Sequence, residues 1–314
     1  MAKSQSPVVS IIVPLLNEDE SLRELHAKIF DVMKRYQKSY EIIFVDDGST
    51  DQSFSVLKEL REKNQGIKII RFRRNFGKAA ALSVGFKEAT GAFVITMDAD
   101  LQDDPEEIPS LIEALGDTYD IVSGWKVKRH DPISKRLPSK LANFVTAKMT
   151  GINIHDMNCG LKAYRREVVK SIHIHGELHR YIPALAHWAG FRITEKPVQH
   201  HPRKFGKTKY GIDRFLRGFL DLMTVLFTTR YIRRPLHLFG VWGLASFLLG
   251  VLIDGYLSVE WFFGHTSLSN RPLFLVGILF IIMGIQFFSI GLLGEMISRQ
   301  ERDEDTYSIR DELK

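Results

Sequence analysis

Short apolar runs alternate with amphipathic stretches through the first third of the chain. Four apolar runs have the length of strands, and the stretches between them place apolar residues at helical spacing, as Leu22, Leu25 and Ile29 do. This alternation predicts four β-α units, and therefore an α/β fold with a mainly parallel, doubly wound, Rossmann-like sheet. The expected strands are 8–14, 40–45, 67–72, 93–97 and, further on, 120–124, and the expected helices are 21–36, 53–63, 78–89 and one that begins near Pro105.

Two long uncharged runs near the C-terminus have the length of membrane spans. Neither 236–253 nor 272–294 contains Asp, Glu, Lys or Arg. A bilayer core of roughly 30 Å needs about 20 apolar residues in a helix, and helices buried in soluble proteins rarely stay uncharged for so long. Arg234 precedes the first run and Arg299 follows the second, whereas Arg271 is the one Lys or Arg between them. The positive-inside rule then places both ends of the pair in the cytoplasm and predicts a multi-pass protein of the cytoplasmic (inner) membrane.

The positive charge of the chain is concentrated just before the first of these runs. The net charge is +6, and nine of the 43 Lys and Arg residues lie within 203–234, where Asp213 and Asp221 are the acidic residues. Within that segment, 211–231 has apolar residues at helical spacing opposite a basic side. A basic amphipathic helix beside a span is typical of the lipid headgroup layer, and packing on the preceding domain is the alternative. This patch indicates an anionic membrane as the partner, with no nucleic acid.

Composition and missing motifs narrow the function classes. The 314 residues are 45% hydrophobic and 25% charged, so the chain can bury a full core. Its one cysteine, Cys159, permits no internal disulfide, and the N-terminus lacks a signal-peptide pattern, which suits a reducing cytoplasm. The sequence has neither Gly-x-Gly-x-x-Gly after the first strand nor Gly-x-x-x-x-Gly-Lys-Ser/Thr, which disfavours dinucleotide oxidoreductases and P-loop NTPases.

Carboxylates follow directly after the fourth expected strand. Asp98 and Asp100 stand one residue apart, with Gln102 two residues further on. Because ligands bind at the carboxyl ends of the strands in an α/β sheet, these side chains are expected at the ligand edge. Mg²⁺ and Mn²⁺ take oxygen ligands and are commonly completed by substrate phosphates, so the pattern predicts a site for one of these ions. The alternative is a solvated turn in which Asp103 or Asp104 caps the next helix.

Polar loops follow the first three expected strands as well, and together the loops resemble a known family. In chain order they are 13–18, 45–51, 75–78 and 98–103. This ordered set closely resembles the nucleotide-sugar-binding half of family-2 glycosyltransferases, which share the GT-A fold. Two later segments, 156–164 and 201–211, extend the resemblance over essentially the whole chain. The extended match resembles the polyprenyl-phosphate glycosyltransferases, relatives of dolichol-phosphate mannose synthase and bactoprenol glucosyltransferase.

The resemblance implies roles for individual residues of these loops. The residues it implies for donor binding are Pro14, Asn17, Glu18, Asp47, Lys78 and Asp98. The implied metal ligands are Asp100 and Gln102, and the implied catalytic residues are Asp98, Asp100 and Asp156. Asp156 is expected to position groups near the reacting centre. For Asp46, a turn residue that caps its own loop and a ligand contact both remain open.

A basic loop after the fifth expected strand is the expected acceptor site. Fixed cations there would bring two anionic substrates within reacting distance, and a solvated charged loop is the alternative. The expected acceptor-phosphate residues are Lys126, Arg129, Lys135, Arg136 and Ser139, and the expected diphosphate residues in the later loop are Arg203, Lys207 and Lys209. The family often has Ser-Arg where this chain has Trp125-Lys126, so the cation that holds the acceptor phosphate stays open.

The function implied by the resemblance is inverting transfer of one sugar from a nucleotide sugar to polyprenyl phosphate at the cytoplasmic membrane face. We expect a UDP-linked donor, with a GDP-linked donor as the alternative, and Mg²⁺ or Mn²⁺ as the cofactor; a homo-oligomer stays open. A processive polysaccharide synthase would carry Gln-x-x-Arg-Trp, which is missing, and a non-catalytic nucleotide-binding membrane scaffold would not need an intact Asp-x-Asp-x-Gln. The expected divisions are a GT-A catalytic domain at 1–210, amphipathic juxtamembrane helices at 211–234, two transmembrane helices at 235–298 and a cytoplasmic tail at 299–314.

Overall fold

The chain folds into two compact units. The computed structural model describes residues 7–127, 151–152, 154–172, 174, 178–202, 204, 235–264 and 271–300. Described residues up to 204 belong to the first unit and those from 235 to 300 to the second, each of which is taken by itself below. The expected boundaries at 210 and 234 fall outside the described residues, so the division of the chain stays a prediction there.

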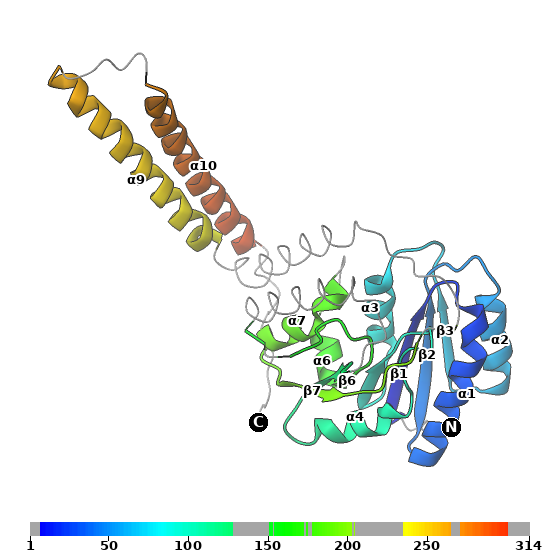
Figure 1. Ribbon diagram of the computed structural model, residues 1–314. Coiled ribbons are helices and arrows are strands. Elements are labelled where there is room, and N and C mark those ends of the chain that lie inside the picture. Colours follow the sequence, from blue (N-terminus) through cyan, green and yellow to red (C-terminus); the bar gives the residue numbers. More distant parts are fainter. Residues whose placement is uncertain are drawn as a thin grey trace. The chain divides into compact units, whose positions relative to one another are not determined.

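The first unit is built on a seven-stranded sheet, drawn as arrows in Figure 1. Its strands are β1 (Val9–Leu15), β2 (Tyr40–Asp46), β3 (Ile67–Arg71), β4 (Phe93–Thr96), β5 (Ile121–Trp125), β6 (Lys162–Arg165) and β7 (Ile193–Pro197). They lie in the order β3-β2-β1-β4-β6-β5-β7. All neighbours pair in parallel except β6, which runs antiparallel to both β4 and β5. The sheet is therefore mixed but mainly parallel, as the alternating pattern predicts.

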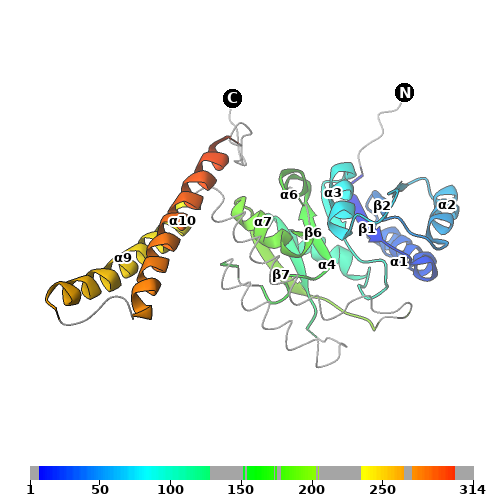
Figure 2. The same ribbon diagram turned by 90° about the horizontal axis from the view of Figure 1, so that it is seen from above.

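Helices cover both faces of this sheet, as the view from above shows (Figure 2). The helices of the first unit are α1 (Asp19–Tyr36), α2 (Ser53–Lys63), α3 (Lys78–Glu88), α4 (Glu107–Leu115), α6 (Arg166–Ser171), the 3-10 helix η1 (Leu178–Tyr181) and α7 (Ile182–Trp188). Apolar residues of α1, α2 and α4 share one core with Val9, Ile11 and Val13 of β1. The neighbouring Ile12 faces the other way, towards α3, because successive side chains of a strand alternate between faces. Both faces of β1 are thus buried, as its apolar run requires.

The structure confirms the first four β-α units and the fifth strand to within about two residues. It adds β6 and β7, which the sequence pattern does not predict. Lys162–Arg165 is too short for a recognisable alternation, and Ile193–Pro197 is mostly polar with intermediate burial because it lies at the sheet edge. The amphipathic helix expected at 211–231 lies outside the described residues.

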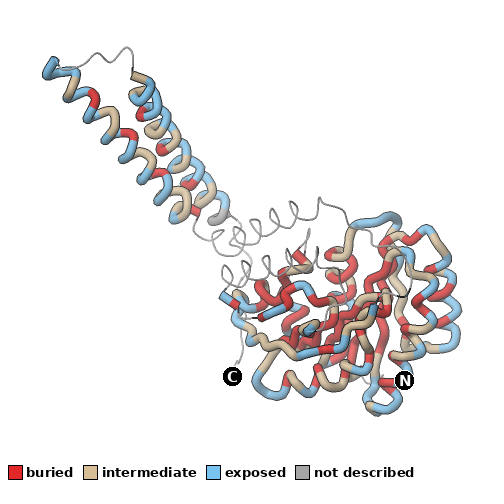
Figure 3. Tube along the Cα trace, in the orientation of Figure 1, coloured by how far each residue is buried: buried red, intermediate tan, exposed pale blue. Residues whose placement is uncertain are grey.

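The second unit is a pair of helices, α9 (Pro235–Phe262) and α10 (Pro272–Gln300). Each is long and apolar enough to cross a membrane, with mean hydropathies of 2.1 and 2.6 over their most apolar windows. Many large apolar residues of both helices are exposed. Figure 3 shows exposed residues along both helices, whereas buried residues gather inside the first unit. Such a surface is stable in lipid rather than in water, so the helix pair associates the protein with a membrane.

Small residues allow the two helices of this pair to pack closely. A Cβ placed on Gly284 would lie 2.7 Å from the carbonyl oxygen of Gly243, and one on Gly250 would lie 2.6 Å from that of Gly277. The Ser246 hydroxyl also donates to the Phe280 carbonyl across the pair, at 2.8 Å. Small residues and interhelical hydrogen bonds are the means by which helices associate in lipid, where the hydrophobic effect offers no drive. The interior of the pair is therefore built for helix contact.

Candidate active site

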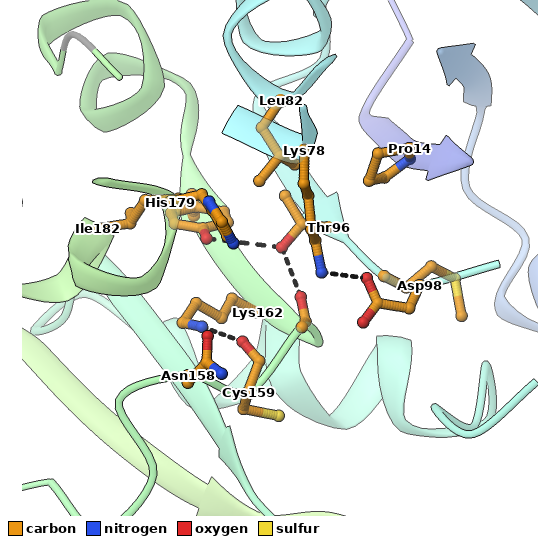
Figure 4. A pocket seen from close by; sticks show the side chains of 13 residues that line it. Pro14, Lys78, Leu82, Thr96, Asp98, Asn158, Cys159, Lys162, His179 and Ile182 are labelled. Atoms are coloured by element: carbon orange, nitrogen blue, oxygen red, sulfur yellow. Dashed lines mark hydrogen bonds and ion pairs between the residues drawn. The ribbon is translucent and has the colours of Figure 1, made fainter. Parts of the chain in front are cut away.

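The candidate site lies at the carboxyl ends of β1, β2 and β4, where the loops after these strands meet. The antiparallel β6 enters the sheet beside β4 and brings the segment 158–162 to the same edge. The cavity shown in Figure 4 lies there, and its lining residues are Pro14, Lys78, Leu82, Thr96, Met97, Asp98, Asn158, Cys159, Gly160, Lys162, Tyr164, His179 and Ile182. Residues from five distant parts of the sequence thus converge on one small space.

An ion pair between Lys78 and Asp98 occupies one side of this cavity. The Lys78 ammonium, on the first residue of α3, donates to the Asp98 carboxylate just after β4 (Figure 4). About a third of each side chain stays exposed, 34% for Lys78 and 33% for Asp98. Burial opposes ionisation of Asp98, but Lys78, followed by Lys126 and His179, outweighs it and lowers the pKa of Asp98 to about 2. Asp98 is therefore an ionised, accessible carboxylate at neutral pH.

Asp47 fixes the loop that leads into Lys78. Its two carboxylate oxygens accept hydrogen bonds from the backbone N–H groups of Phe76 and Gly77, at 2.7 and 3.0 Å. Gly77 has φ +94°, a conformation that favours glycine, and this turn starts α3 at Lys78. Burial, with a smaller contribution from Asp46, raises the pKa of Asp47 against the two amide hydrogen bonds. The structure thus gives Asp47 a local role beside the donor-binding role that the resemblance implies.

Asn17 and Asp46 organise the loops after β1 and β2. The Asn17 backbone N–H donates to the Ser49 hydroxyl at 2.9 Å, and its side-chain oxygen accepts from the Thr50 N–H at 2.8 Å. Asp46 is fully buried and accepts from the Ser49 N–H at 2.8 Å, with Arg71 3.3 Å from its other oxygen. Asp46 therefore caps its own turn, one of the two roles left open by the sequence.

Glu18 and Pro14 complete the expected donor residues. The Glu18 backbone N–H donates to the Ser53 hydroxyl at 3.0 Å, which joins the start of α1 to the start of α2. Pro14 lies in β1 and lines the cavity next to Lys78. The structure brings the two residues to the edge that the sequence predicts.

Asp100 and Gln102 lie on a tight turn just beyond Asp98. The Asp100 carboxylate accepts from the Gln102 N–H at 3.2 Å, and Leu101 between them has a left-handed φ of +60°. The Gln102 carbonyl accepts from the His201 N–H at 2.9 Å, which places the later segment 199–202 against this turn. Asp104 accepts from the Glu106 N–H at 3.0 Å and so shapes the turn before α4, whose N-cap residue, Glu106, has no side-chain cap.

The oxygens of this turn suit a hard divalent cation. Asp98 is ionised and partly exposed, and the carboxylate of Asp100 and the amide oxygen of Gln102 belong to the same short loop. Among the residues that the structure describes, no group of three or more His, Cys, Asp and Glu side chains could hold a metal by itself. The donor set therefore fits Mg²⁺ or Mn²⁺ that is completed by waters and substrate oxygens.

Lys126 and Asp103 form a second, more deeply buried ion pair. The Lys126 ammonium lies 3.0 Å from an Asp103 oxygen, and the two side chains are 15% and 1% exposed. Burial would lower the pKa of Lys126, but Asp103 and Asp98 raise it above its usual value. The other Asp103 oxygen accepts from the Asp98 N–H at 3.2 Å. The ion pair therefore holds the loop 98–103, which carries the expected metal ligands, in place. The role of Lys126 towards an acceptor phosphate stays a prediction.

Gly160, on the segment before β6, lets the chain pass close to both carboxylates. A Cβ at this position would lie 2.8 Å from an Asp98 oxygen and 3.1 Å from an Asp103 oxygen. The Gly160 carbonyl accepts from the Thr96 hydroxyl of β4 at 2.8 Å, which holds the segment in place. A side chain at 160 would displace the acidic loop, so the site requires glycine here.

Lys162 and His179 place further nitrogen atoms around the cavity. Lys162 is 3% exposed and donates to the Cys159 carbonyl, as Figure 4 shows. Burial lowers the pKa of Lys162, and burial followed by Lys78 and Arg180 lowers that of His179 to about 3. His179 is therefore neutral at pH 7. Burial also raises the pKa of the Cys159 thiol to about 12, which makes it a poor nucleophile.

Asp156 is the remaining expected catalytic residue, and it is buried. Asp156 is 3% exposed, and its carbonyl accepts from the Ser123 hydroxyl of β5 at 3.4 Å. Seven expected residues lie outside the described part of the chain: Arg129, Lys135, Arg136, Ser139, Arg203, Lys207 and Lys209. Their roles stay predictions.

Sequence reasoning missed Asp103, Gly160, Lys162 and His179 as members of the site. Asp103 belongs to a loop that the sequence does single out, and its distance from Lys126 along the chain hides their pairing. Gly160 and Lys162 come to the edge through β6, whose pairing with β4 no local pattern reveals. His179 carries no motif, so no sequence signal could have found it.

Comparison with known proteins settles the family. Residues 10–172 match the family model described as Glycosyl transferase family 2, which covers more than half of the chain and the whole of the loop set above. The chain belongs to glycosyl transferase family 2. It is a glycosyltransferase, as the resemblance predicts.

Two curated relatives match this family-2 transferase over nearly its full length. A dodecaprenyl-phosphate galacturonate synthase of Rhizobium johnstonii is 38% identical over 308 residues, which cover 96% of this chain and 90% of the relative. An undecaprenyl-phosphate 4-deoxy-4-formamido-L-arabinose transferase of Pseudomonas aeruginosa is 36% identical over 298 residues, covering 94% of this chain and 86% of the relative. Both matches are long enough to include the apolar helices.

Solved structures share the fold of the first unit. Glucosyl-3-phosphoglycerate synthase of Mycobacterium tuberculosis, in complex with Mn²⁺, uridine diphosphate and phosphoglyceric acid, superimposes with a TM-score of 0.56 at 18% identity. The match covers 71% of this chain and 78% of that one. At this identity the likeness confirms the GT-A-like architecture of the family-2 transferase and says no more.

Proposed function

We propose that this family-2 transferase moves a single sugar, with inversion, from a nucleotide sugar to a polyprenyl phosphate. One observation carries the proposal: the two relatives that span nearly the whole chain, apolar helices included, are named for a sugar and a polyprenyl phosphate. What supports this reaction at the sheet edge is an ionised carboxylate, a partly exposed lysine and metal-suited oxygens next to a cavity.

The donor side of the proposal rests on the loops after β1, β2 and β4. Asp98, Asp100 and Gln102 would hold Mg²⁺ or Mn²⁺, and the bound ion would neutralise charge on the leaving nucleoside diphosphate. We propose a UDP-linked donor, with a GDP-linked donor as the alternative that the assay below distinguishes. We expect Lys78 to bind a phosphate oxygen, and its position at the carboxylate loop supports this role.

The acceptor side requires little base catalysis. A phosphate monoester has a second pKa of about 6 and is therefore already anionic at pH 7. Its oxygen can attack the anomeric carbon opposite the diphosphate, which inverts the configuration as the bond to the diphosphate breaks. Rate enhancement then depends on positioning two anions and on stabilising the charge that develops on the leaving group. Asp156, which is buried, would position neighbouring groups rather than accept a proton.

The membrane side of the proposal follows from the second unit. We propose that α9 and α10 both cross the cytoplasmic membrane and that the first unit works at its cytoplasmic face, where nucleotide sugars are made. The arginines of 230–234 before α9 and Arg299 at the end of α10 favour this orientation. A polyprenyl acceptor is confined to that membrane, so the helices would keep the enzyme on the surface that holds its substrate.

A test of the proposal uses purified full-length protein in detergent with undecaprenyl phosphate, Mn²⁺ and a panel of UDP-linked and GDP-linked sugars. Mass spectrometry of the extracted lipid is expected to show one added sugar mass with at least one donor. Addition of many sugar units would favour a processive synthase. Nucleotide binding without any lipid product, across the whole panel, would favour a non-catalytic scaffold.

A further inference from the structure

The Lys78–Asp98 ion pair joins a residue expected to bind the donor to a carboxylate expected near the metal. Both side chains are about a third exposed, so the pair lies at the mouth of the site and not in the core. Without ligands, the ammonium supplies the positive charge that Asp98 would otherwise receive from a divalent cation.

We infer that Lys78 is a displaceable counter-cation, which holds Asp98 before ligands arrive and moves to the diphosphate when metal and donor bind together. This inference rests on the proposed function, because it assumes a nucleoside diphosphate as the ligand. If this inference holds, Lys78 weakens the binding of a divalent cation when no nucleotide is present. A nucleoside diphosphate relieves that opposition by offering the ammonium new anionic oxygens.

The surroundings of Lys78 confine its motion to the side chain. The backbone just before it is held by the two hydrogen bonds from Phe76 and Gly77 to Asp47. Lys78 then begins α3, so its Cα has a fixed position at the sheet edge. A lysine has a flexible four-carbon stem with a point charge at its end, which can reach different acceptors from one Cα.

The other nitrogen-bearing groups near Asp98 are less suited to this exchange. Lys126 is 15% exposed and bound to Asp103, whose side chain is 1% exposed. Lys162 is 3% exposed and donates to the Cys159 carbonyl. Burial keeps His179 neutral, so it brings no charge at pH 7. Of the groups described around Asp98, Lys78 is the charged one that combines exposure with direct contact.

The charges around Asp98 determine whether Lys78 strengthens or weakens the binding of a divalent cation. A divalent cation held by Asp98 and Asp100 would lie close to the Lys78 ammonium, and like charges repel each other more strongly in a protein site than in bulk water. A diphosphate placed between them turns this repulsion into two attractions. By thermodynamic linkage, whatever metal does to nucleotide affinity, nucleotide does equally to metal affinity.

The test measures Mn²⁺ binding directly, by electron paramagnetic resonance of the free ion, on full-length protein with and without UDP. The variants are Lys78→Met, which removes the charge, and Lys78→Arg, which keeps it. Lys68→Met is the matched control, since Lys68 also pairs with a carboxylate, Glu41 at 2.7 Å, but on β3, away from the acidic loop. Thermal unfolding of each variant checks that the fold is retained.

For Mn²⁺ alone, Lys78→Met is expected to bind at least about tenfold more tightly than wild type, whereas Lys78→Arg and Lys68→Met bind as wild type does. UDP is expected to tighten Mn²⁺ binding less in Lys78→Met than in wild type. A Lys78→Met variant that binds Mn²⁺ alone no more tightly than wild type, including no binding by either, overturns the inference. Failure of the proposed function would look different, because UDP would then leave Mn²⁺ binding unchanged in every protein.

Discussion

Residues that could bind a ligand spend much of their hydrogen-bonding capacity on shaping the site. Asp47 binds the amides before α3, Asn17 joins the first two loops, and Asp46 caps a turn from a fully buried position. Such contacts fix the loops before a substrate arrives, which reduces the ordering that binding must supply. A variant at these positions therefore changes loop geometry as well as any ligand contact.

Gly160 offers a test of how tightly the acidic loop is packed. Gly160→Ala would place a methyl group 2.8 Å from an Asp98 oxygen, so the loop must move. We expect a loss of about 1–3 kcal/mol in stability and a loss of at least about tenfold in kcat. Thermal unfolding and steady-state turnover measure the two effects. Gly255→Ala is the control, because a Cβ at Gly255 meets no heavy atom within 4 Å, and its activity should match wild type.

The lowered pKa of His179 predicts a pH dependence of stability. The pKa is about 3 in the folded chain, mainly through burial, against about 6.5 for an unperturbed histidine. The unfolded chain therefore takes up this proton below about pH 6.5 while the folded chain does not, so stability falls as the pH is lowered from about 6.5 towards 3. His179→Gln should flatten this decline, by at most about 1.4 kcal/mol per pH unit, in thermal unfolding between pH 7 and 4. An equally steep decline in the variant would assign the acid sensitivity to other groups.

At the scale of elements, the sequence specifies the first four β-α units well and the rest of the sheet poorly. Runs such as Val9–Leu15 are apolar because both faces are buried, and amphipathic α1 follows at helical spacing, so local pattern and final environment agree. β6 is a four-residue strand whose place between β4 and β5 depends on distant pairing. Gly160 and Lys162 could not be predicted as site residues for the same reason, because they reach the site through the pairing of β6. The loops after β1, β2 and β4 could be predicted because their chemistry lies next to a strand end.

The packing of α9 on α10 depends on its glycines. Gly284→Val would press a branched side chain into the backbone of α9, 2.7 Å from the Gly243 carbonyl oxygen and the Phe247 nitrogen. We expect the helix pair to lose about 1–3 kcal/mol, seen as a lower thermal midpoint and less protein in the membrane. Gly255→Val adds the same side chain to open space, so it should accumulate normally. Equal accumulation of both variants would show that the pair does not need close contact.

At the scale of the whole molecule, the two long apolar helices and the basic residues outside them predict a topology. Alkaline phosphatase joined after residue 314 should be inactive, because that end is expected in the cytoplasm. The same enzyme inserted within 265–270, between α9 and α10, should be active outside the membrane. Activity in both fusions, or in neither, would contradict two crossings.

We propose that the carboxylates at the sheet edge form a catalytic site for transfer to a lipid phosphate. The most direct measurement is single-sugar transfer to undecaprenyl phosphate by wild type and Asp100→Asn, each with Mn²⁺ and with EDTA. We expect Asp100→Asn to lose about a hundredfold or more in turnover while UDP binding persists, and we expect EDTA to abolish transfer by the wild type. Undiminished transfer by Asp100→Asn, or full turnover by wild type in EDTA, would contradict it.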